Sequence, residues 1–355
     1  MRKSLLSSLI ATGLSAALSF PALAAPKTDF SVCWTIYAGW MPWEYGQAEG
    51  IVDKWAKKYD INIDVVQLND YVESINQYTA GQFDGCTMTN MDALTIPAAG
   101  GVDSTALIIG DFSNGNDGIV LKGEKKTLGD LKGQDVNLVE LSVSHYLLAR
   151  GLEKANLSEK DLKVVNTSDA DLVAAFATDD VTAVATWNPL LAEIEAAPSV
   201  TKVFDSSQIP GEIIDLMVVN SDTLKDNPAL GKALTGAWYE IMATMSADSD
   251  AGKAAREHMA KASGTDLAGY EAQLAATKMF YSAKDAVAFA NSPKLPATMT
   301  KVAEFSFSHG LLGEGAKSAD AIGMGFAKDV ITGDKSNLKL RFDPSFMQMA
   351  ADGTL

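Results

Sequence analysis

Short runs of apolar and β-branched residues recur along this chain, and stretches with helical periodicity separate them. The runs predict strands at 30–36, 61–68, 83–89, 104–112, 136–139, 162–165, 183–186, 202–204 and 213–220. Helical stretches at 71–80 and 91–99 lie between the earlier runs, and helices that begin near Ser144, Asp169 and Pro189 lie between the later ones. Because strands alternate with helices, we expect an α/β fold with mainly parallel sheets that are covered on both faces.

Two groups of turn-forming residues divide this pattern. The sequence NGNDG occupies 114–118, and PG occupies 210–211 just before the strand predicted at 213–220. We therefore predict two lobes joined by two extended crossings, with residues 25–112 and 218–355 in lobe 1 and residues 113–217 in lobe 2. Helices predicted at 229–245, 251–262, 266–279 and 298–307 give lobe 1 a helical C-terminal part.

The first 24 residues have the features of a secretory signal peptide. Arg2 and Lys3 are followed by an apolar stretch over 5–20 and by a small-residue cleavage site, Ala22-Leu23-Ala24. The formal net charge is −16, and removal of the two basic residues makes it −16 − 2 = −18. We expect a soluble periplasmic monomer, and the negative charge argues against nucleic acid or an anionic membrane as a partner.

Aromatic and polar residues gather where the predicted strands end. Tyr37, Trp40 and Trp43 follow the first strand, and Trp187-Asn188 follows a later one. Ligands of open α/β sheets bind at the carboxyl ends of strands, beside helix N-termini. The predicted ligand-binding residues are Tyr37, Trp40, Trp43, Asn90, Asp92, Glu140, Ser144, Trp187, Asn188 and Asp215.

The charges near these strand ends have one sign. The windows 33–43, 83–92, 136–149, 183–190 and 205–220 contain Asp and Glu but neither Lys nor Arg. Sites for oxyanions normally place Arg or Lys on the anion. Carboxylates beside aromatic faces suit a cation such as guanidinium, although urea could use the same planar slot. We prefer guanidinium and keep urea as the alternative.

Catalysis is the competing class of function. The sequence contains no G-x-S-x-G elbow, no P-loop, and no Rossmann G-x-G-x-x-G motif. It also lacks CxxC and HExxH, and its three histidines are widely scattered, so no metal site and no cofactor are expected. The two cysteines, Cys33 and Cys86, are as compatible with buried thiols as with a disulfide.

Several longer runs resemble those of one protein family. These runs are CWTIYAGWMPW (33–43), FDGCTMTNMDALTIPAAGGVDSTALIIGDFSNGNDGI (83–119), VNLVELSVSHYLLARGLE (136–153), VVNTSDADLVAAF (164–176), ATWNPLL (185–191) and IPGEIIDLMVVN (209–220). They resemble the NitT/TauT family of ABC-importer binding proteins, in particular a branch named for urea and linked to guanidine. The resemblance implies a type II-like periplasmic binding protein that delivers a small ligand to a membrane permease driven by a cytoplasmic ATPase. Nitrate, taurine, other sulfonates or a pyrimidine precursor are the alternative ligands within the same family.

Overall fold

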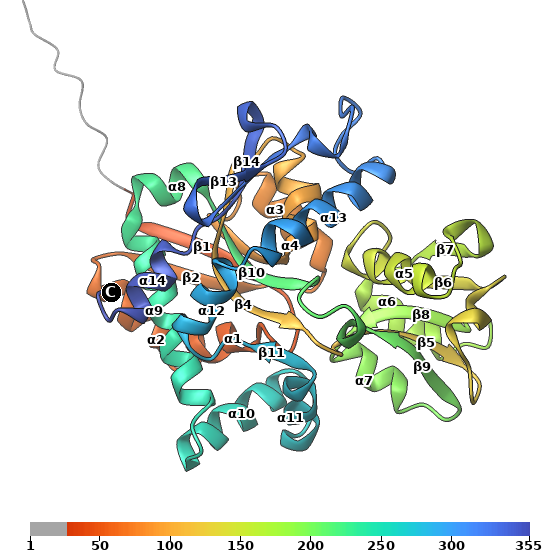
Figure 1. Ribbon diagram of the computed structural model, residues 1–355. Helices are drawn as coiled ribbons and strands as arrows, with labels where there is room; N and C mark the ends of the chain where they lie inside the picture. Colours follow the sequence, from red (N-terminus) through yellow and green to blue (C-terminus); the bar gives the residue numbers. More distant parts are fainter. Residues whose placement is uncertain (1–26) are drawn as a thin grey trace, which may run out of the picture.

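The strands of the computed structural model, which describes residues 27–355, form two separate sheets in two lobes (Figure 1). The larger, nine-stranded sheet has the order β13-β12-β14-β4-β10-β3-β1-β2, with β11 paired to β4. The smaller sheet has five strands in the order β7-β6-β8-β5-β9. The expected two-lobed α/β fold is therefore confirmed, whereas the expected signal peptide lies outside the described residues.

The strands of the larger sheet come from both ends of the described chain. They are β1 (Asp29–Trp34), β2 (Asn62–Gln67), β3 (Gly85–Thr89), β4 (Ser104–Ser113), β10 (Ile214–Asn220), β11 (Thr277–Met279), β12 (Gly323–Phe326), β13 (Val330–Thr332) and β14 (Leu338–Phe342). The smaller sheet is formed by β5 (Asp117–Lys122), β6 (Asp135–Leu138), β7 (Lys163–Asn166), β8 (Ala183–Trp187) and β9 (Val200–Asp205).

Helices of the larger lobe precede and follow the smaller lobe in the sequence. They are α1 (Met41–Ala48), α2 (Ile51–Lys58), α3 (Tyr71–Thr79), α4 (Asn90–Ala93), α8 (Ser221–Asp226), α9 (Pro228–Met245), α10 (Asp250–Ala262), α11 (Leu267–Ala275), α12 (Ala283–Ala290), α13 (Lys294–Ser308) and α14 (Ser345–Ala351). The smaller lobe contains α5 (Val143–Lys154), α6 (Asp169–Phe176) and α7 (Leu190–Glu195). Among residues 27–355, no helix is long and apolar enough to cross a bilayer.

Both sheets are mixed, which corrects the expectation of mainly parallel sheets. Strand β10 lies antiparallel between β3 and β4, and β5 lies antiparallel between β8 and β9. Each of these two strands enters its sheet directly from a crossing between the lobes. A chain that passes straight from one sheet into the other arrives without the helical connection that parallel strands require. Strand β10 begins at Ile214, so the larger sheet starts before the boundary expected at 217.

The two crossings lie side by side and are tied together by serine hydroxyls. Ser113, at the end of β4, is 2.7 Å from Ser206 between their Oγ atoms. The backbone N–H of Gly115 also donates to Ser206 Oγ at 2.7 Å, and Asp117 N–H donates to Ser113 Oγ at 3.1 Å. These bonds fix the position of Asp117, the first residue of β5, next to the larger lobe.

The C-terminal part differs from the predicted succession of helices. Strand β11 occupies the end of the helix expected at 266–279, and β12, β13 and β14 extend the edge of the larger sheet. In the segment that follows the first strand, Trp43 belongs to the helix α1. Pro42 lies in the first turn of this helix, where its missing N–H costs no hydrogen bond.

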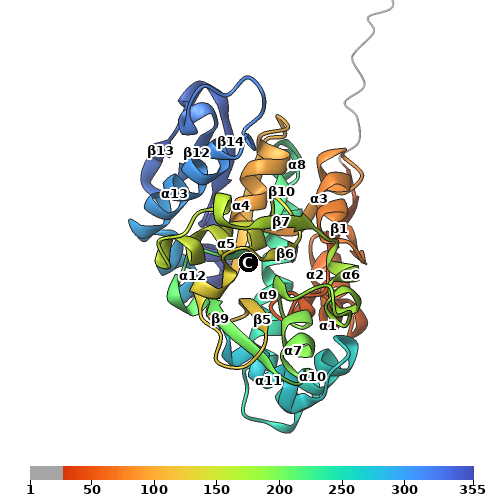
Figure 2. The same ribbon diagram turned by 90° about the vertical axis from the view of Figure 1, so that its right-hand side faces the viewer.

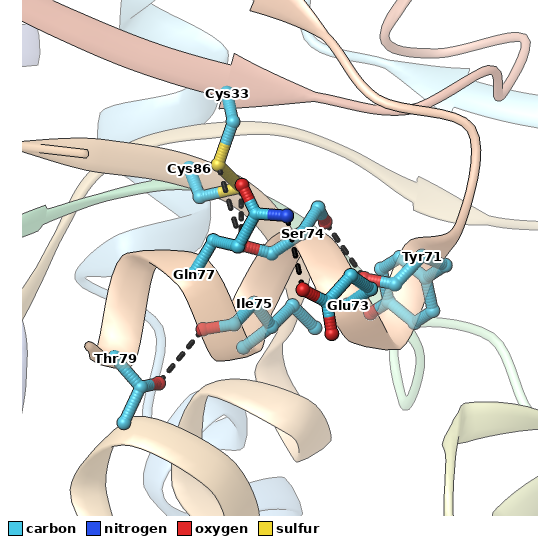
Figure 3. Close-up of a disulfide and its surroundings, with 8 residues drawn as sticks. All are labelled: Cys33, Tyr71, Glu73, Ser74, Ile75, Gln77, Thr79 and Cys86. Carbon is cyan, nitrogen blue, oxygen red and sulfur yellow. Dashed lines mark hydrogen bonds between the residues drawn. A yellow bond between two sulfur atoms is a disulfide. The ribbon is translucent and has the colours of Figure 1, made fainter. Parts of the chain in front are cut away.

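A disulfide joins two neighbouring strands of the larger sheet (Figure 3). Cys33 on β1 and Cys86 on β3 are register partners in the parallel pair, and their Cα atoms lie 4.4 Å apart. Figure 3 shows the bridge directly above α3, where the carbonyl of Ser74 lies 3.5 Å from Cys33 Sγ. The structure thus resolves the alternative that the sequence left open.

We predict that reduction of this bridge destabilises the protein. The bridge closes a loop with a sequence separation of 53 residues. Loss of a bridge of this kind typically costs about 2–4 kcal/mol. Thermal unfolding with and without reductant measures the effect, with the Cys33→Ala/Cys86→Ala double variant as the control that should not respond. An unchanged midpoint for wild type, with both thiols shown to be reduced, would contradict the prediction.

Candidate ligand-binding site

A small cavity of about 20 Å³ lies between the lobes, where strand ends from both sheets meet. Its lining residues are all buried, so the structure shows the two lobes closed around it. The larger lobe contributes Tyr37, Trp40, Tyr71, Thr89, Ile213 and Asp215, and the smaller lobe contributes Asp117, Val143 and Trp187.

Four aromatic rings form much of the wall. Trp40 stacks on Tyr71 with ring centroids 5.8 Å apart, and Tyr37 meets Trp40 edge-on at 5.0 Å. Trp187, at the end of β8, meets Tyr71 edge-on at 5.5 Å and so carries the aromatic wall across to the smaller lobe. A wall of this composition can hold a flat or cationic group against the faces of its rings.

Two carboxylates line the same cavity, and strand register explains how they arrive there. Asp215 on β10 is paired with Thr89 on one side and with Asp111 on the other, so these residues form one row across three strands. Asp117, the first residue of β5, is paired with Trp187 across the smaller sheet. In the closed form, the row that contains Asp215 and the pair formed by Asp117 and Trp187 meet at the cavity.

Asp111 supports this site from behind the cavity. Tyr37 donates a hydrogen bond to Asp111 Oδ1 at 3.2 Å. The other oxygen, Oδ2, packs against the backbone of Gly39, where an added Cβ would lie only 2.5 Å from it. Gly39 is therefore required for the close approach of this loop to the carboxylate, and Tyr270 holds the loop by donating to the carbonyl of Ala38 at 3.0 Å.

A fourth buried carboxylate, Asp92, lies at the start of α4. Its Oδ2 accepts hydrogen bonds from Tyr71 at 2.7 Å and from Thr89 Oγ1 at 2.8 Å. Burial raises the pKa of Asp92 to about 6, although these bonds and the backbone N–H of Val143 oppose the shift. Because Val143 is the first residue of α5, the N-terminus of that helix already faces a carboxylate of the opposite lobe.

The buried aspartates resist ionisation in the closed, ligand-free state. Burial raises the pKa of Asp111 and that of Asp117 to about 7. Burial, together with the neighbouring Asp111, raises the pKa of Asp215 well above its usual range. Within the described part of the chain, Asp92 Oδ1, Asp111 Oδ2 and Asp215 Oδ2 have no hydrogen-bond partner. None of the residues that line the cavity is Lys or Arg. The site therefore offers acceptors and lacks positive charge.

The structure brings four of the predicted site residues to the cavity: Tyr37, Trp40, Trp187 and Asp215. Asp92 and Ser144 are adjacent to lining residues without lining it, and Ser144 Oγ is buried with no partner among the described residues. Asn188 caps α7 by accepting from Ala192 N–H at 2.9 Å.

The remaining three predicted residues have other surroundings. Trp43 packs against Trp238 at 5.1 Å inside the larger lobe. Asn90 holds the second crossing, because it accepts from Ile214 N–H at 2.9 Å and donates to the carbonyl of Glu212 at 3.1 Å. The side chain of Glu140 is exposed and does not line the cavity.

Sequence reasoning missed three of the important residues. The signal that singled out Asp215, an acid within an apolar strand, is equally present at Asp111. Asp117 lies in the NGNDG turn, which we interpreted only as a boundary between lobes. Tyr71 begins a helix directly after a strand, a position that the strand-end rule would have included had it been applied to every strand.

A larger, open cleft lies outside the cavity. It has a volume of about 680 Å³ and is lined by both lobes. Asp169 and Glu193 of the smaller lobe line it, and Ile36, Leu68 and Asn69 of the larger lobe face them. Trp187 lines both the cleft and the cavity, so its ring is the partition between them. We call this cleft the vestibule.

Comparisons with known proteins agree with this architecture. The periplasmic aliphatic sulphonate-binding protein SsuA of Escherichia coli superposes with a TM-score of 0.67 at 18% identity, covering 82% of this chain and 95% of SsuA. The nitrate-binding protein NrtA of Synechocystis superposes with a TM-score of 0.57 at 13% identity, covering 93% and 100% of the two chains. Two α/β lobes closed on a buried cavity define a protein with the periplasmic binding protein fold.

Sequence comparison identifies the family. The NMT1/THI5-like family model matches residues 55–252, and the chain belongs to this family. A protein of Brucella abortus, provisionally named as a binding protein, is 26% identical over 145 residues. That match covers 40% of this chain and less than half, 44%, of the relative. A protein of Escherichia coli, provisionally named for aliphatic sulfonates, is 42% identical over 64 residues, or 18% of this chain and 20% of that relative.

We predict that ligand-free protein loses stability as the pH rises from about 4 to about 7. The pKa of aspartate in an unfolded chain is near 3.9, whereas burial raises the pKa of Asp117 to about 7 in the folded protein. The folded state therefore binds more protons than the unfolded state in this window, and its free energy of unfolding falls with rising pH. Thermal unfolding of wild type and Asp117→Asn across this range isolates the contribution. Wild type should lose about 1 kcal/mol or more relative to the variant, and a relative gain would contradict the prediction.

Proposed function

We propose that this protein is the periplasmic solute-binding component of an ABC importer, which captures a small ligand between its lobes and delivers it to a permease. The fold, the family and the names of its relatives support this role. The signal-peptide pattern of residues 1–24 supports the periplasmic location. A ligand closed between two lobes presents the permease with a distinct liganded shape, which is how two-lobed binding proteins report occupancy.

We further propose that the ligand is guanidinium. The observation that carries this proposal is the set of buried carboxylates around the cavity without a Lys or Arg among the lining residues. Two of them, Asp117 and Asp215, reach the cavity directly, and Asp111 supports Asp215 from behind. A buried carboxylate is stable only when it is protonated or paired with a positive charge. A guanidinium ion would supply that charge, together with six N–H donors and no acceptor.

The hydrogen-bonding capacity of the site distinguishes guanidinium from the alternatives. Of the lining carboxylates, Asp215 has an oxygen, Oδ2, without a partner among the described residues, and as an acceptor it calls for a ligand that donates hydrogen bonds. Urea offers four N–H groups but also a carbonyl that needs a donor, and it carries no charge. Trp40 Nε1 is a buried lining donor that has no partner among the described residues, so urea remains the closest alternative.

Sulfonates are the candidate that the names of the relatives favour. A sulfonate or nitrate brings only acceptors and a negative charge to a site that already contains buried carboxylates. A helix N-terminus can hold an anion without a basic side chain, but the N-terminus of α5 faces Asp92. The volume of about 20 Å³ is also far below the roughly 300–1,000 Å³ typical of sites for drug-sized ligands. The charge of the site therefore argues against both anions, and its size argues against the larger sulfonates.

Isothermal titration of purified protein at pH 8 with guanidinium, urea, nitrate and taurine tests this function. We predict that guanidinium binds most tightly and that Asp117→Asn and Asp215→Asn each weaken it about 10- to 100-fold. This estimate follows from the roughly 1.5–3 kcal/mol contributed by a hydrogen bond to a charged partner.

Glu140→Gln is the matched control. It removes the charge of an exposed acid that lies just before α5, outside the cavity, and should leave the affinity for guanidinium unchanged. Tight binding of taurine or nitrate without a response to guanidinium would exclude the cation and retain the transport role. A preference for urea that the Asp215→Asn variant leaves intact would exclude charge pairing. Failure of every small solute to bind would argue against the transport role itself.

Trp187 should set the size limit of the ligand. Its ring separates the small cavity from the vestibule, so an N-alkyl substituent on guanidinium would collide with it when the lobes close. We predict that Trp187→Ala improves the affinity for butylguanidinium relative to guanidinium by about 10-fold or more, because fitting a methylene is worth about 1–3 kcal/mol. Trp187→Phe is the control that keeps most of the partition. Equal weakening of both ligands would show that the ring only stabilises the closed form.

A further inference from the structure

A second junction between the lobes contains three potential metal ligands. His145 belongs to α5 of the smaller lobe, and Glu159 begins the short helical turn Glu159–Asp161 that follows it. His309 caps the C-terminus of α13 in the larger lobe. The potential ligand atoms of these three residues all lie within 4.8 Å of one another. Figures 1 and 2 both show α13 beside α5, away from the crossings between the lobes.

The hydrogen bonds of His309 direct a lone pair at the carboxylate. Its Nδ1 lies 2.9 Å from the carbonyl oxygen of Phe305, which can only accept. Ser308 Oγ also lies 3.1 Å from Nδ1, but its hydroxyl donates to the same carbonyl at 2.7 Å, so we assign the ring proton to Nδ1. Its Nε2 lies 2.8 Å from Glu159 Oε1. A neutral ring therefore presents Nε2 as an acceptor to another acceptor. A cation, either a proton or a metal ion, must lie between them.

His145 presents a second nitrogen to the same oxygen. Its Nε2 is 3.4 Å from Glu159 Oε1 and, within residues 27–355, has no hydrogen-bond partner of acceptable geometry. The side chain is only 3% exposed, so water does not readily compensate for the missing partner. Two imidazole rings thus approach one carboxylate, and the buried nitrogen of His145 lacks a partner. The polar cluster is therefore incomplete.

We propose that His145, Glu159 and His309 bind a divalent transition-metal ion of the Zn²⁺ type across the two lobes. Two imidazole nitrogens and one carboxylate oxygen are a ligand set that holds zinc and leaves a fourth position for water. The contact from Phe305 to His309 Nδ1 is the kind of outer-shell bond that orients a metal-binding histidine. A groove of about 860 Å³, lined by Glu159 and His309, borders the cluster and gives water access to the fourth position.

Metal binding requires local changes at both histidines. Leu141 N–H donates to His145 Nδ1 at 3.1 Å, so this bond must give way for the ring proton to move from Nε2 to Nδ1. Leu141 is exposed, and water can satisfy its N–H afterwards. The separation of 2.8 Å between His309 Nε2 and Glu159 Oε1 must also widen to about 3.3 Å, as tetrahedral bonds of about 2.0–2.1 Å require.

Neighbouring basic residues do not prevent a cation from approaching. Arg150, Lys160 and Lys301 line the same groove. Arg150 and Lys301 are bound to Glu212, at 2.8 Å and 3.1 Å, and Lys160 is exposed, so that solvent screens its charge. Because His309 belongs to one lobe and the other two ligands belong to the opposite lobe, the metal would favour the closed form. Any ligand that also favours the closed form would then bind more tightly with metal present, and metal would bind more tightly with that ligand. The metal site itself does not depend on the ligand being guanidinium.

The histidine content of the chain allows a sharply controlled test. Of the three histidines, only His258 lies outside the cluster, and it is close to two carboxylates within the larger lobe. Its Nε2 lies 2.9 Å from Glu44, and its Nδ1 lies 4.0 Å from Glu49. Protein stripped with chelator is titrated with Zn²⁺ by calorimetry and followed by thermal unfolding, as wild type, His309→Gln, Glu159→Gln and His258→Gln.

We expect wild type and His258→Gln to bind one Zn²⁺ and to unfold at a higher temperature with it. His309→Gln and Glu159→Gln should raise the dissociation constant at least about 10-fold, and their metal-free unfolding temperatures show whether they remain folded. Spin labels placed on the two lobes should report a shorter distance between the lobes when Zn²⁺ is added to wild type. The same labels should report no change in His309→Gln or Glu159→Gln. Absence of stoichiometric binding, binding lost only in His258→Gln, or equal binding by all variants would overturn the proposal.

Discussion

The burial of negative charge between the lobes is the constraint on which the rest of the structure depends. Asp92, Asp111, Asp117 and Asp215 are all buried around one small cavity, and no Lys or Arg lines it. Their raised pKa values express the cost of ionising them in this environment. The closed form therefore becomes favourable when something positive enters the cavity or when protons bind. A cationic ligand would act as the missing counterion and would draw the lobes together.

The fold places these acids by means of its two crossings. Strands β5 and β10 each enter a sheet directly from a crossing, so their first residues lie at the junction of the lobes. Asp117 is the first residue of β5 and Asp215 is the second residue of β10, and register with β4 and β8 adds Asp111 and Trp187. The same part of the chain also carries the contacts that hold the lobes closed. Glu212, just before β10, binds Arg150 of the smaller lobe and Lys301 of the larger lobe.

Much of this arrangement could be predicted from the sequence because it follows from local pattern. Alternating apolar runs located the strands, and the rule that ligands bind at strand ends selected Tyr37, Trp40, Trp187 and Asp215. The rule failed where tertiary packing decides the direction of a side chain. Trp43 was expected beside Trp40, but α1 turns its ring toward Trp238, and no local signal distinguishes the two directions.

The remaining features depend on residues that are distant in the sequence. The pairing of Cys33 with Cys86 rests on strand register, which the sequence leaves undetermined. The proximity of His145 and His309 could not be predicted because they are far apart in the chain. They meet only because α13 packs beside α5 across the lobes. The small strands β12 to β14 were missed because each is too short to show a period.

The central claim is that a cation provides the positive charge that the buried aspartates lack, and proton release on binding tests it most directly. Calorimetric titration with guanidinium in buffers of different ionisation enthalpy measures the number of protons exchanged. Because the pKa of Asp117 lies at about 7 in the closed form without ligand, we predict net proton release at pH 6. The contribution of Asp117 to this release should diminish toward pH 8, where this group is already largely ionised. Binding that takes up protons, or that exchanges none at pH 6, would contradict the claim.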